Sequence, residues 1–375
     1  MKSILSAAAL LVAAVAVSTA QVPTPAEFLG YELGDRFTRH HKVVDYAQLL
    51  AEGSDRAVWT PYGRTSEYRD LGLLVVTSPD NHANLEALRA ANLARTQGTG
   101  LAGDDPGVVF VYLSYNVHGN EAVCTEAALR TMHALVSGTD AGGRDVTTWL
   151  DRAVVLIDPC VNPDGRDRYV AFQDRTSGLT PNADLSTVEH DEPWPGGRSN
   201  HFMFDMNRDW AWQTQVETQG RVTAYRSWMP QVHVDFHEQG INSPYYFAPA
   251  AEPFHKIISP WQRKCQEHIG ANNARWFDAR GALYFTREVF DLFYPAYGDT
   301  WPLYNGAIGM TYEQGGSGRA GRAALTSLGD TLTLAYRIQN HHESGLSTIE
   351  ESVRRAEELV TEFAAYHQRN VEAPF

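Results

Sequence analysis

The chain has few cysteines: only Cys124, Cys160 and Cys265 occur among its 375 residues. Three cysteines close at most one disulfide, which excludes the disulfide-rich scaffolds that stabilise small secreted domains. We expect the thiols to be buried, where they act as small hydrophobic side chains. A hydrophobic core must therefore stabilise the fold. Apolar residues make up 43% of the chain, which suffices for one large domain or two modest ones.

Basic residues are also scarce relative to acidic ones. The chain carries 31 lysines and arginines against 45 aspartates and glutamates, which gives a net charge of −14. Such a surface repels the phosphate backbone of nucleic acids and the headgroups of anionic lipids. We therefore exclude a nucleic-acid partner, although the charge alone does not identify a substrate.

Long hydrophobic runs are absent except at the start of the chain. Lys2 precedes an almost wholly apolar run, residues 4–17, and three small residues follow it at positions 18–20. The run is shorter than the roughly 20 apolar residues that a membrane-spanning helix needs. We therefore predict a cleaved secretory signal peptide over residues 1–20, no stable membrane insertion after cleavage, and a secreted or periplasmic location. Retention of the segment as an anchor is the alternative.

Apolar strand patterns alternate with amphipathic helix patterns along the rest of the chain. This alternation is typical of an α/β fold with a mixed, mostly parallel twisted sheet and helices on both faces. We predict a single catalytic domain over residues 68–375, and an N-terminal leader segment, residues 21–67, that packs on it. Ligands of such sheets bind beyond the carboxyl ends of the strands. The expected strands lie within residues 68–78, 108–115, 152–165, 229–240 and 306–316, and the expected helices within residues 45–56, 80–97, 125–137, 260–281 and 348–370.

A histidine and a glutamate follow one of these strands closely. His118 and Glu121 lie where the strand of residues 108–115 gives way to a helix, and Gly119 allows a tight turn between them. Both side chains can therefore face one crevice and bind one metal ion. A catalytic zinc needs a third protein ligand and leaves one position for water. The alternative interpretation is a helix start with a solvated acid.

The strand expected within residues 229–240 supplies the candidates for a third ligand. Side chains alternate between the two faces of a strand, so His233, Asp235 and His237 share one face of the segment QVHVDFHEQG. His237 ends the strand and is the better ligand, whereas His233 lies further inside. This polar face beside the first pair of candidates favours a metal site over the alternative.

A further carboxylate stands at a third strand end. Glu313 follows the apolar segment AIGMT and precedes two glycines, and its side chain is placed to face the same crevice. Partial desolvation at such a position, beside a catalytic zinc, suits a general base. A surface glutamate before a glycine turn is the alternative.

The segment GGRSNHFMFDMNRDW carries groups that bind anions. Asn207 and Arg208 offer an amide and a planar guanidinium, a natural pair for binding a carboxylate. Arg198 follows two glycines and can reach an oxyanion as its charge develops. Asp205 can accept the second ring N–H of a ligand histidine and so fix its tautomer. The alternative for an isolated Asn-Arg pair is a structural ion pair, but arginines beside a metal site in an acidic chain favour the binding role.

The chain resembles the zinc carboxypeptidases of the carboxypeptidase A type, the M14 metallopeptidase family. The matching segments occur in the order of that family and span residues 118–313, and flanking elements extend the likeness to most of residues 45–370. HGNE alone is a weak signal, whereas seven segments in order are a strong one. The segments are HGNE, NPDG, an arginine nine residues before NR, DMNRDW, DFHE, FYPAYGDTW and TYEQGG.

The resemblance implies a set of roles for the residues of the site. It implies one Zn²⁺ per chain, held by His118, Glu121 and His237, and it implies that Glu313 is the general base. The remaining roles that it implies are oxyanion stabilisation by Arg198, binding of the terminal carboxylate of the substrate by Asn207 and Arg208, and support of the first zinc histidine by Asp205.

Two features of the substrate site have more than one interpretation. The family closes a mobile tyrosine over bound substrate, and Tyr294 and Tyr297 both occupy the matching region. We assign the catalytic role to Tyr297 and a substrate-binding role to Tyr294. Asp299 lies near the pocket floor of the family, where a buried carboxylate favours release of Lys or Arg. Alternatively, Asp299 caps a turn after Gly298, and the aromatic residues 245–247 form the pocket wall.

The sequence therefore predicts a secreted zinc metallocarboxypeptidase. Its partner is a peptide or protein with a free C-terminal carboxylate, whose last peptide bond it hydrolyses with a zinc-activated water. The alternative is a zinc-dependent amidase or deacylase of the same fold, which acts on cell-wall peptides or N-acyl amino acids. A binding module descended from such an enzyme is a third interpretation, which predicts eroded ligands or base, whereas all of these residues are present.

Overall fold

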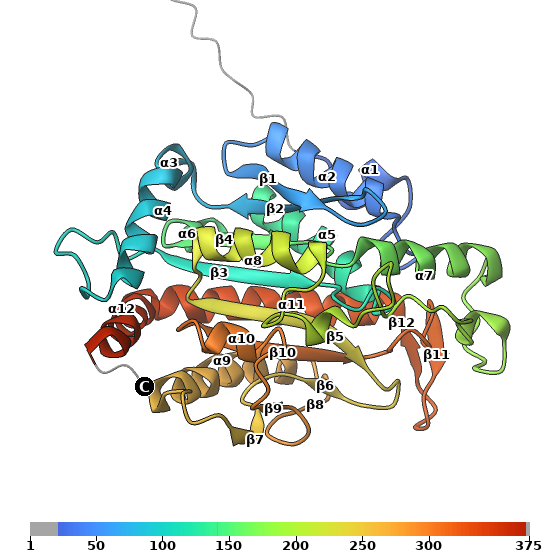
Figure 1. The fold of residues 1–375 in the computed structure, drawn as a ribbon. Helices are drawn as coiled ribbons and strands as arrows, with labels where there is room; N and C mark the ends of the chain where they lie inside the picture. Colours follow the sequence, from blue (N-terminus) through green and yellow to red (C-terminus); the bar gives the residue numbers. More distant parts are fainter. Residues whose placement is uncertain (1–21, 141, 373–375) are drawn as a thin grey trace, which may run out of the picture.

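The computed structural model describes residues 22–140 and 142–372, and a twisted eight-stranded sheet forms its centre (Figure 1). The predicted signal peptide, residues 1–20, lies wholly outside the described residues. The sheet is mixed and mostly parallel with helices on both faces, so the predicted fold class is confirmed. In order across the sheet, the strands are β1 (Ala57–Arg64), β2 (Asp70–Val76), β4 (Ala153–Asp158), β3 (Val109–Tyr115), β5 (Val232–Gln239), β10 (Ile308–Gly315), β6 (Tyr245–Tyr246) and β8 (Tyr284–Phe285).

The four central strands β4, β3, β5 and β10 run parallel to one another. Antiparallel pairs join β1 to β2, β2 to β4 and β10 to β6. Strands β3 and β4 are buried along their whole length, as expected of strands covered on both faces. The carboxyl ends of β3, β5 and β10 therefore meet at one edge of the sheet. In the register of β5 and β10, Glu313 lies opposite His237.

Helices cover both faces of this sheet. One face packs against α2 (His40–Glu52), α5 (Val123–Ser137), α9 (Pro260–Asp278) and α11 (Leu334–Arg354), and the other against α4 (Leu85–Ala94) and α8 (Val216–Trp228). Val111 belongs to the first core and Phe110 to the second, as strand alternation requires. The other elements are α1 (Pro25–Leu29), α3 (Pro79–Ala83), α6 (Thr147–Leu150), α7 (Pro163–Thr176), α10 (Thr300–Leu303), α12 (Ala356–Glu372), β7 (Ala251–Phe254), β9 (Asp291–Leu292), β11 (Ala323–Leu325), β12 (Thr331–Thr333) and the 3₁₀ turns η1 (Arg95–Gln97), η2 (Val188–His190) and η3 (Met206–Arg208).

Three segments differ from the sequence-based expectation. The predicted leader contributes the edge strand β1 to the main sheet. The segment NPDGRDRY, residues 162–169, has the composition of a turn and is expected to form one, but it begins helix α7. The side chain of Asn162 accepts a hydrogen bond from the backbone of Gly165, and Pro163 occupies the first helical position. The C-terminal helical region starts earlier than predicted and consists of α11 and α12, with a break at Arg355.

The cysteines agree with the expectation from composition. Cys124, Cys160 and Cys265 are all buried free thiols. Among the described residues, no helix is both long and apolar enough to cross a lipid bilayer.

A buried histidine makes the stability of the fold sensitive to acid. His342 in α11 is 3% exposed, and burial lowers its pKa to about 3. An unfolded histidine has a pKa of about 6.5, so on acidification the unfolded chain takes up a proton before the folded chain does. The stability contributed by neutral His342 is thus complete above a pH of about 6.5 and is lost as the pH falls through the folded pKa.

His342→Gln should therefore remove part of the acid sensitivity. We expect the difference in free energy of unfolding between the wild type and this variant to shrink by roughly 2 kcal/mol from pH 7 to pH 5. Urea unfolding at the two pH values measures this difference, and the exposed substitution His41→Gln is the control. If the wild type and the variant differ by the same free energy of unfolding at both pH values, His342 does not resist protonation in the folded protein.

Candidate metal centre

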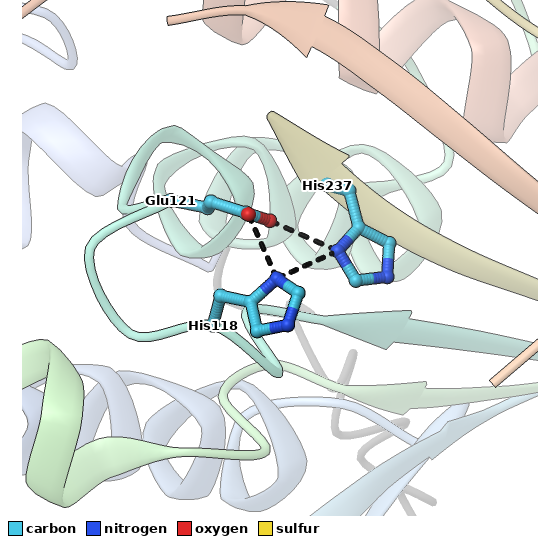
Figure 2. Close-up of side chains that lie close together, drawn as sticks. All are labelled: His118, Glu121 and His237. Carbon is cyan, nitrogen blue, oxygen red and sulfur yellow. Dashed lines mark hydrogen bonds and ion pairs between the residues drawn. The ribbon is translucent and has the colours of Figure 1, made fainter. Parts of the chain in front are cut away.

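Three side chains converge at the carboxyl ends of β3 and β5 (Figure 2). The Nδ1 atom of His118 lies 2.7 Å from Glu121 Oε1, and the Nδ1 atom of His237 lies 2.9 Å from Glu121 Oε2. The two Nδ1 atoms are 3.2 Å apart. All three side chains are buried. The structure therefore brings the three predicted zinc ligands together.

The turn between β3 and α5 is shaped around two of these ligands. Asn116 adopts a backbone φ of +67°, and its side-chain amide donates to the carbonyl oxygens of His118, Gly119 and Glu121. A Cβ on Gly119 would lie 2.2 Å from backbone atoms of α7. Glycine is thus required between the two ligands because α7 packs against it, and not because of the turn, since the backbone φ of Gly119 is not in the left-handed region.

A carboxylate holds each ligand histidine through its other ring nitrogen. Nε2 of His118 lies 3.0 Å from Asp205 Oδ1, and Nε2 of His237 lies 3.0 Å from Asp235 Oδ2. Such contacts keep a proton on Nε2 and leave the Nδ1 lone pair for a metal. Burial raises the pKa of Glu121, but His118 and His237 outweigh it and hold that pKa well below the usual range. Glu121 is therefore a carboxylate.

The three ligand atoms fit a zinc ion. Zinc binds imidazole nitrogens at about 2.0–2.1 Å, which places two nitrogens of one tetrahedral site roughly 3.3 Å apart. The corresponding separation between His118 and His237 is 3.2 Å. Two imidazoles and one carboxylate leave a fourth position open, as in catalytic rather than structural zinc sites.

Glu313 faces the same cavity as the ligands without belonging to the triad. It is 8% exposed and lies on β10, opposite His237. Burial raises its pKa to about 8, and the charges of Glu121 and Asp235 act in the same direction. A cation held by the triad would lower the pKa of Glu313 toward 7, and a general base works best when its pKa is near the working pH.

Two arginines flank Asp205 at the mouth of the cavity. Arg198 Nη2 lies 2.9 Å and Arg208 Nη1 3.9 Å from Asp205 Oδ2, and the side chains of both arginines are 47% exposed. Arg198 Nη1 also lies 3.5 Å from Glu121 Oε1. Burial raises the pKa of Asp205, but His118 and the two arginines hold it well below the usual range. The two guanidinium groups can both offer donors to an anionic ligand.

The segment before α10 closes the other side of the mouth. The backbone N–H of Gly298 donates to Asn207 Oδ1 at 2.8 Å, and the guanidinium of Arg208 lies 4.5 Å from the centre of the Tyr297 ring. Tyr297 lines the cavity. Tyr294 is 39% exposed and packs edge-on against Tyr297 at 5.1 Å. This geometry favours Tyr297 over Tyr294 as the tyrosine that contacts a ligand.

Asp299 lines the same cavity, whose volume is about 340 Å³. Its carboxylate accepts a hydrogen bond from Thr300 at 2.9 Å and makes no capping bond to the backbone of α10. Burial raises its pKa to about 6. These contacts favour the pocket interpretation of Asp299 over the turn cap. Residues 245–247 are buried, with Tyr245 and Phe247 in the main core, rather than forming an aromatic pocket wall.

Fold and site together define a mononuclear zinc hydrolase. The family model for zinc carboxypeptidases, peptidase M14, matches residues 43–235. The match covers more than half of the chain, and the chain belongs to the zinc carboxypeptidase family. It is thus a zinc metallocarboxypeptidase with a zinc site at His118, Glu121 and His237. A search of curated protein sequences finds no matching relative.

Solved structures share the fold at low sequence identity. A metallo-carboxypeptidase from Burkholderia cenocepacia is 14% identical with a TM-score of 0.56, and the match covers 85% of this chain and 68% of that one. Carboxypeptidase A from Helicoverpa armigera is 15% identical with a TM-score of 0.53, over 88% of this chain and 74% of that one. A metallo-carboxypeptidase from Pseudomonas aeruginosa is 14% identical with a TM-score of 0.53, over 86% and 70%.

Two residues of the site were not assigned a role from sequence. Strand alternation placed Asp235 on the face of His237, which was the available signal for its contact with that ligand. No sequence pattern pointed to Gly298, because glycine is needed there only to leave room for Asp235, which is distant in sequence. A Cβ at Gly298 would lie 1.9 Å from Asp235 Oδ2.

Gly298→Ala should therefore weaken zinc binding, although Gly298 is not a ligand. The added methyl group displaces Asp235 from His237, and loss of such support weakens metal affinity by about 10–100-fold. Competition with a chromophoric chelator measures the zinc affinity. Gly103→Ala is the matched control, since a Cβ there meets nothing within 4 Å. Equal zinc affinity in the two variants would show that Gly298 does not position Asp235.

Proposed function

We propose that this metallocarboxypeptidase hydrolyses the last peptide bond of peptides with a free C-terminal carboxylate. The observation that carries the proposal is one cavity lined by the zinc ligands, by Glu313, and by the Asn207–Arg208 pair. A metal site alone fits many hydrolases. A guanidinium and an amide beside it select a substrate that ends in an anion.

Asn207 and Arg208 bind and orient the substrate in this proposal. The guanidinium of Arg208 is half exposed and rests on the ring of Tyr297, so its remaining N–H groups can reach a carboxylate in the cavity. The side chain of Asn207 is fixed by Gly298. Holding the terminal carboxylate at this pair sets the scissile bond over the ligand triad, which converts binding into correct orientation.

Glu313 and Arg198 act on the reacting atoms. Bound zinc supplies a Lewis acid that polarises the scissile carbonyl and lowers the pKa of water toward about 7. Glu313 takes a proton from the attacking water and later gives it to the leaving amine. Arg198 donates to the carbonyl oxygen as negative charge develops there.

The residue released is proposed to be basic. Asp299 is 6% exposed, lines the cavity, and lies beside strand β10 near Thr311. A carboxylate at this position favours Lys or Arg at the end of the substrate, because an ion pair in a desolvated pocket is stronger than one in water.

The location outside the cytoplasm is a further part of the proposal. It is supported by the apolar run of residues 4–17 and the small residues that follow it. Sequencing the N-terminus of the protein recovered from periplasm and medium tests it, and a chain that still begins at Met1 would contradict cleavage.

Peptides that differ only at the C-terminus test the role of Arg208. We expect a peptide with a free carboxylate to be cleaved, and its C-terminal amide to be cleaved far more slowly. Arg208→Ala should lower kcat/KM for the free acid by roughly 100-fold, because hydrogen bonds to charged groups each contribute about 1.5–3 kcal/mol. Arg226→Ala, an exposed arginine of α8, is the control. Equal cleavage of acid and amide by the wild type would redirect the proposal to an amidase or endopeptidase.

A further inference from the structure

We propose that the loop of residues 200–204 is an upstream docking surface, which binds an apolar side chain of the substrate on the N-terminal side of the cleaved bond. The inference rests on the proposed peptidase function and adds where the rest of the substrate lies. It concerns Phe202, Met203 and Phe204, whose exposed fractions are 61%, 41% and 50%.

Hydrogen bonds hold the backbone of this loop in one conformation. Asn200 is fully buried, and its side-chain oxygen accepts hydrogen bonds from the backbone N–H groups of Phe202 and Phe204 at 3.1 and 3.0 Å. The backbone of Asn200 also donates to the carbonyl of Phe204 at 3.1 Å. Arg168 of α7 donates to the carbonyl oxygens of Ser199 and Asn200 at 2.8 and 3.0 Å. The backbone that carries the three apolar side chains is therefore held in place.

The backbone of this loop is strained at one residue. Met203 has a φ of +64°, in the left-handed region that residues with a side chain rarely adopt. A strained turn that keeps three large apolar side chains in water gains nothing for the stability of the isolated chain. Strain that the surrounding structure maintains, together with an exposed apolar patch, marks an interaction surface.

The cavity extends across the sheet from the end of β3 to the end of β10. Strands β3, β5 and β10 are successive neighbours. The cavity therefore runs from Arg198, which contacts Glu121 after β3, past His237 on β5, to Asp299 and Thr311 beside β10.

This direction determines where a longer substrate leaves the centre. With its carboxylate on Asn207 and Arg208 and its last side chain toward Asp299, the preceding residues extend toward Arg198. The loop begins two residues after Arg198, and Phe204 is joined directly to Asp205. Arg198 and Asp205 are themselves in contact at 2.9 Å, so the apolar loop between them begins and ends at the mouth of the cavity, on the side where the upstream chain emerges.

The side chains of the loop indicate which kind of substrate side chain it binds. The side chains of residues 202–204 carry no charge, in a chain whose net charge is −14. Two aromatic rings and a thioether contact apolar and aromatic side chains favourably. We therefore expect Phe, Leu or a similar residue at one upstream position of preferred peptides.

A scan with a single phenylalanine tests this surface. The substrates are acetylated glycine peptides that end in the residue released fastest, with Phe placed at each of the second to fifth positions before the cleaved bond. We expect kcat/KM of the wild type to be about 10-fold higher for the best Phe peptide than for the all-glycine peptide, since part of an aromatic side chain leaves water. In Phe202→Ser/Phe204→Ser, this ratio should fall to about 2 or less.

The control is Leu328→Ser, a substitution of a still more exposed apolar side chain in the turn between β11 and β12, which should keep the ratio of the wild type. A ratio near one in the wild type, or an unchanged ratio in the double variant, would overturn the docking surface while leaving the peptidase function intact. Failure of the wild type to cleave even the all-glycine peptide and every Phe peptide would overturn the proposed function and this inference with it.

Discussion

Glu313→Gln should lower kcat by about 10³-fold, within the usual range for loss of a positioned general base, while zinc stays bound. Glutamine keeps the size of Glu313 and its place on β10, but its amide cannot take a proton from water. The residue lies outside the ligand triad, so the metal content should remain near one per chain. Steady-state kinetics together with metal analysis of the same preparation measure both quantities.

The control for this prediction is Glu288→Gln, an exposed acid in the segment before the mouth of the cavity. It changes the net charge equally and should leave kcat unchanged. Near-normal turnover in Glu313→Gln would assign the general base elsewhere. Loss of zinc from that variant would mean that Glu313 supports the metal rather than the proton transfer.

His237→Ala should remove zinc from the protein and abolish activity. Structural zinc sites with four ligands bind with about 10–16 kcal/mol, or roughly 2.5–4 kcal/mol per ligand, so loss of one ligand weakens affinity by about 10²–10³-fold. Removal of His237 also leaves the buried carboxylate of Asp235 with only the hydroxyl of Ser114 as a hydrogen-bond donor in place of two partners. Metal analysis after dialysis against a weak chelator should find the variant nearly free of zinc.

His233 offers a sharp control for the choice of ligand. It shares a strand face with His237 and was the weaker candidate from sequence. In the structure it is fully buried and stacks on Tyr112 at 5.0 Å, outside the ligand triad. His233→Phe keeps this stacking and should keep zinc. Loss of zinc in His233→Phe but not in His237→Ala would show that His233, rather than His237, is the zinc ligand.

The parts of the fold that follow from regular periodicity could be predicted from the sequence. Strand β3 is a continuous apolar run, and alternation along β5 placed His237 and Asp235 on one face. Because the carboxyl ends of parallel strands meet at one edge, the ligands could be expected to converge. The roles of Arg198, Asn207, Arg208 and Tyr297 rest on the family resemblance and stay predictions.

Other parts depend on contacts that no local pattern encodes. Strand β1 was not predicted, because Pro61 interrupts its apolar pattern and it is only partly buried as an edge strand. Helix α7 was taken for a turn, because Asn, Pro, Asp and Gly favour turns as well as helix starts. The need for glycine at position 298 arises from Asp235, which is distant in sequence.

The central claim is that this zinc centre releases single residues from the C-terminus of peptides. Mass spectrometry tests this activity: a mixed peptide library is incubated with the protein, with and without a zinc chelator. We expect chelator-sensitive loss of one C-terminal residue, with Lys and Arg lost fastest because of Asp299. Peptides that stay intact in both samples, or cleavage within the chain, would contradict it.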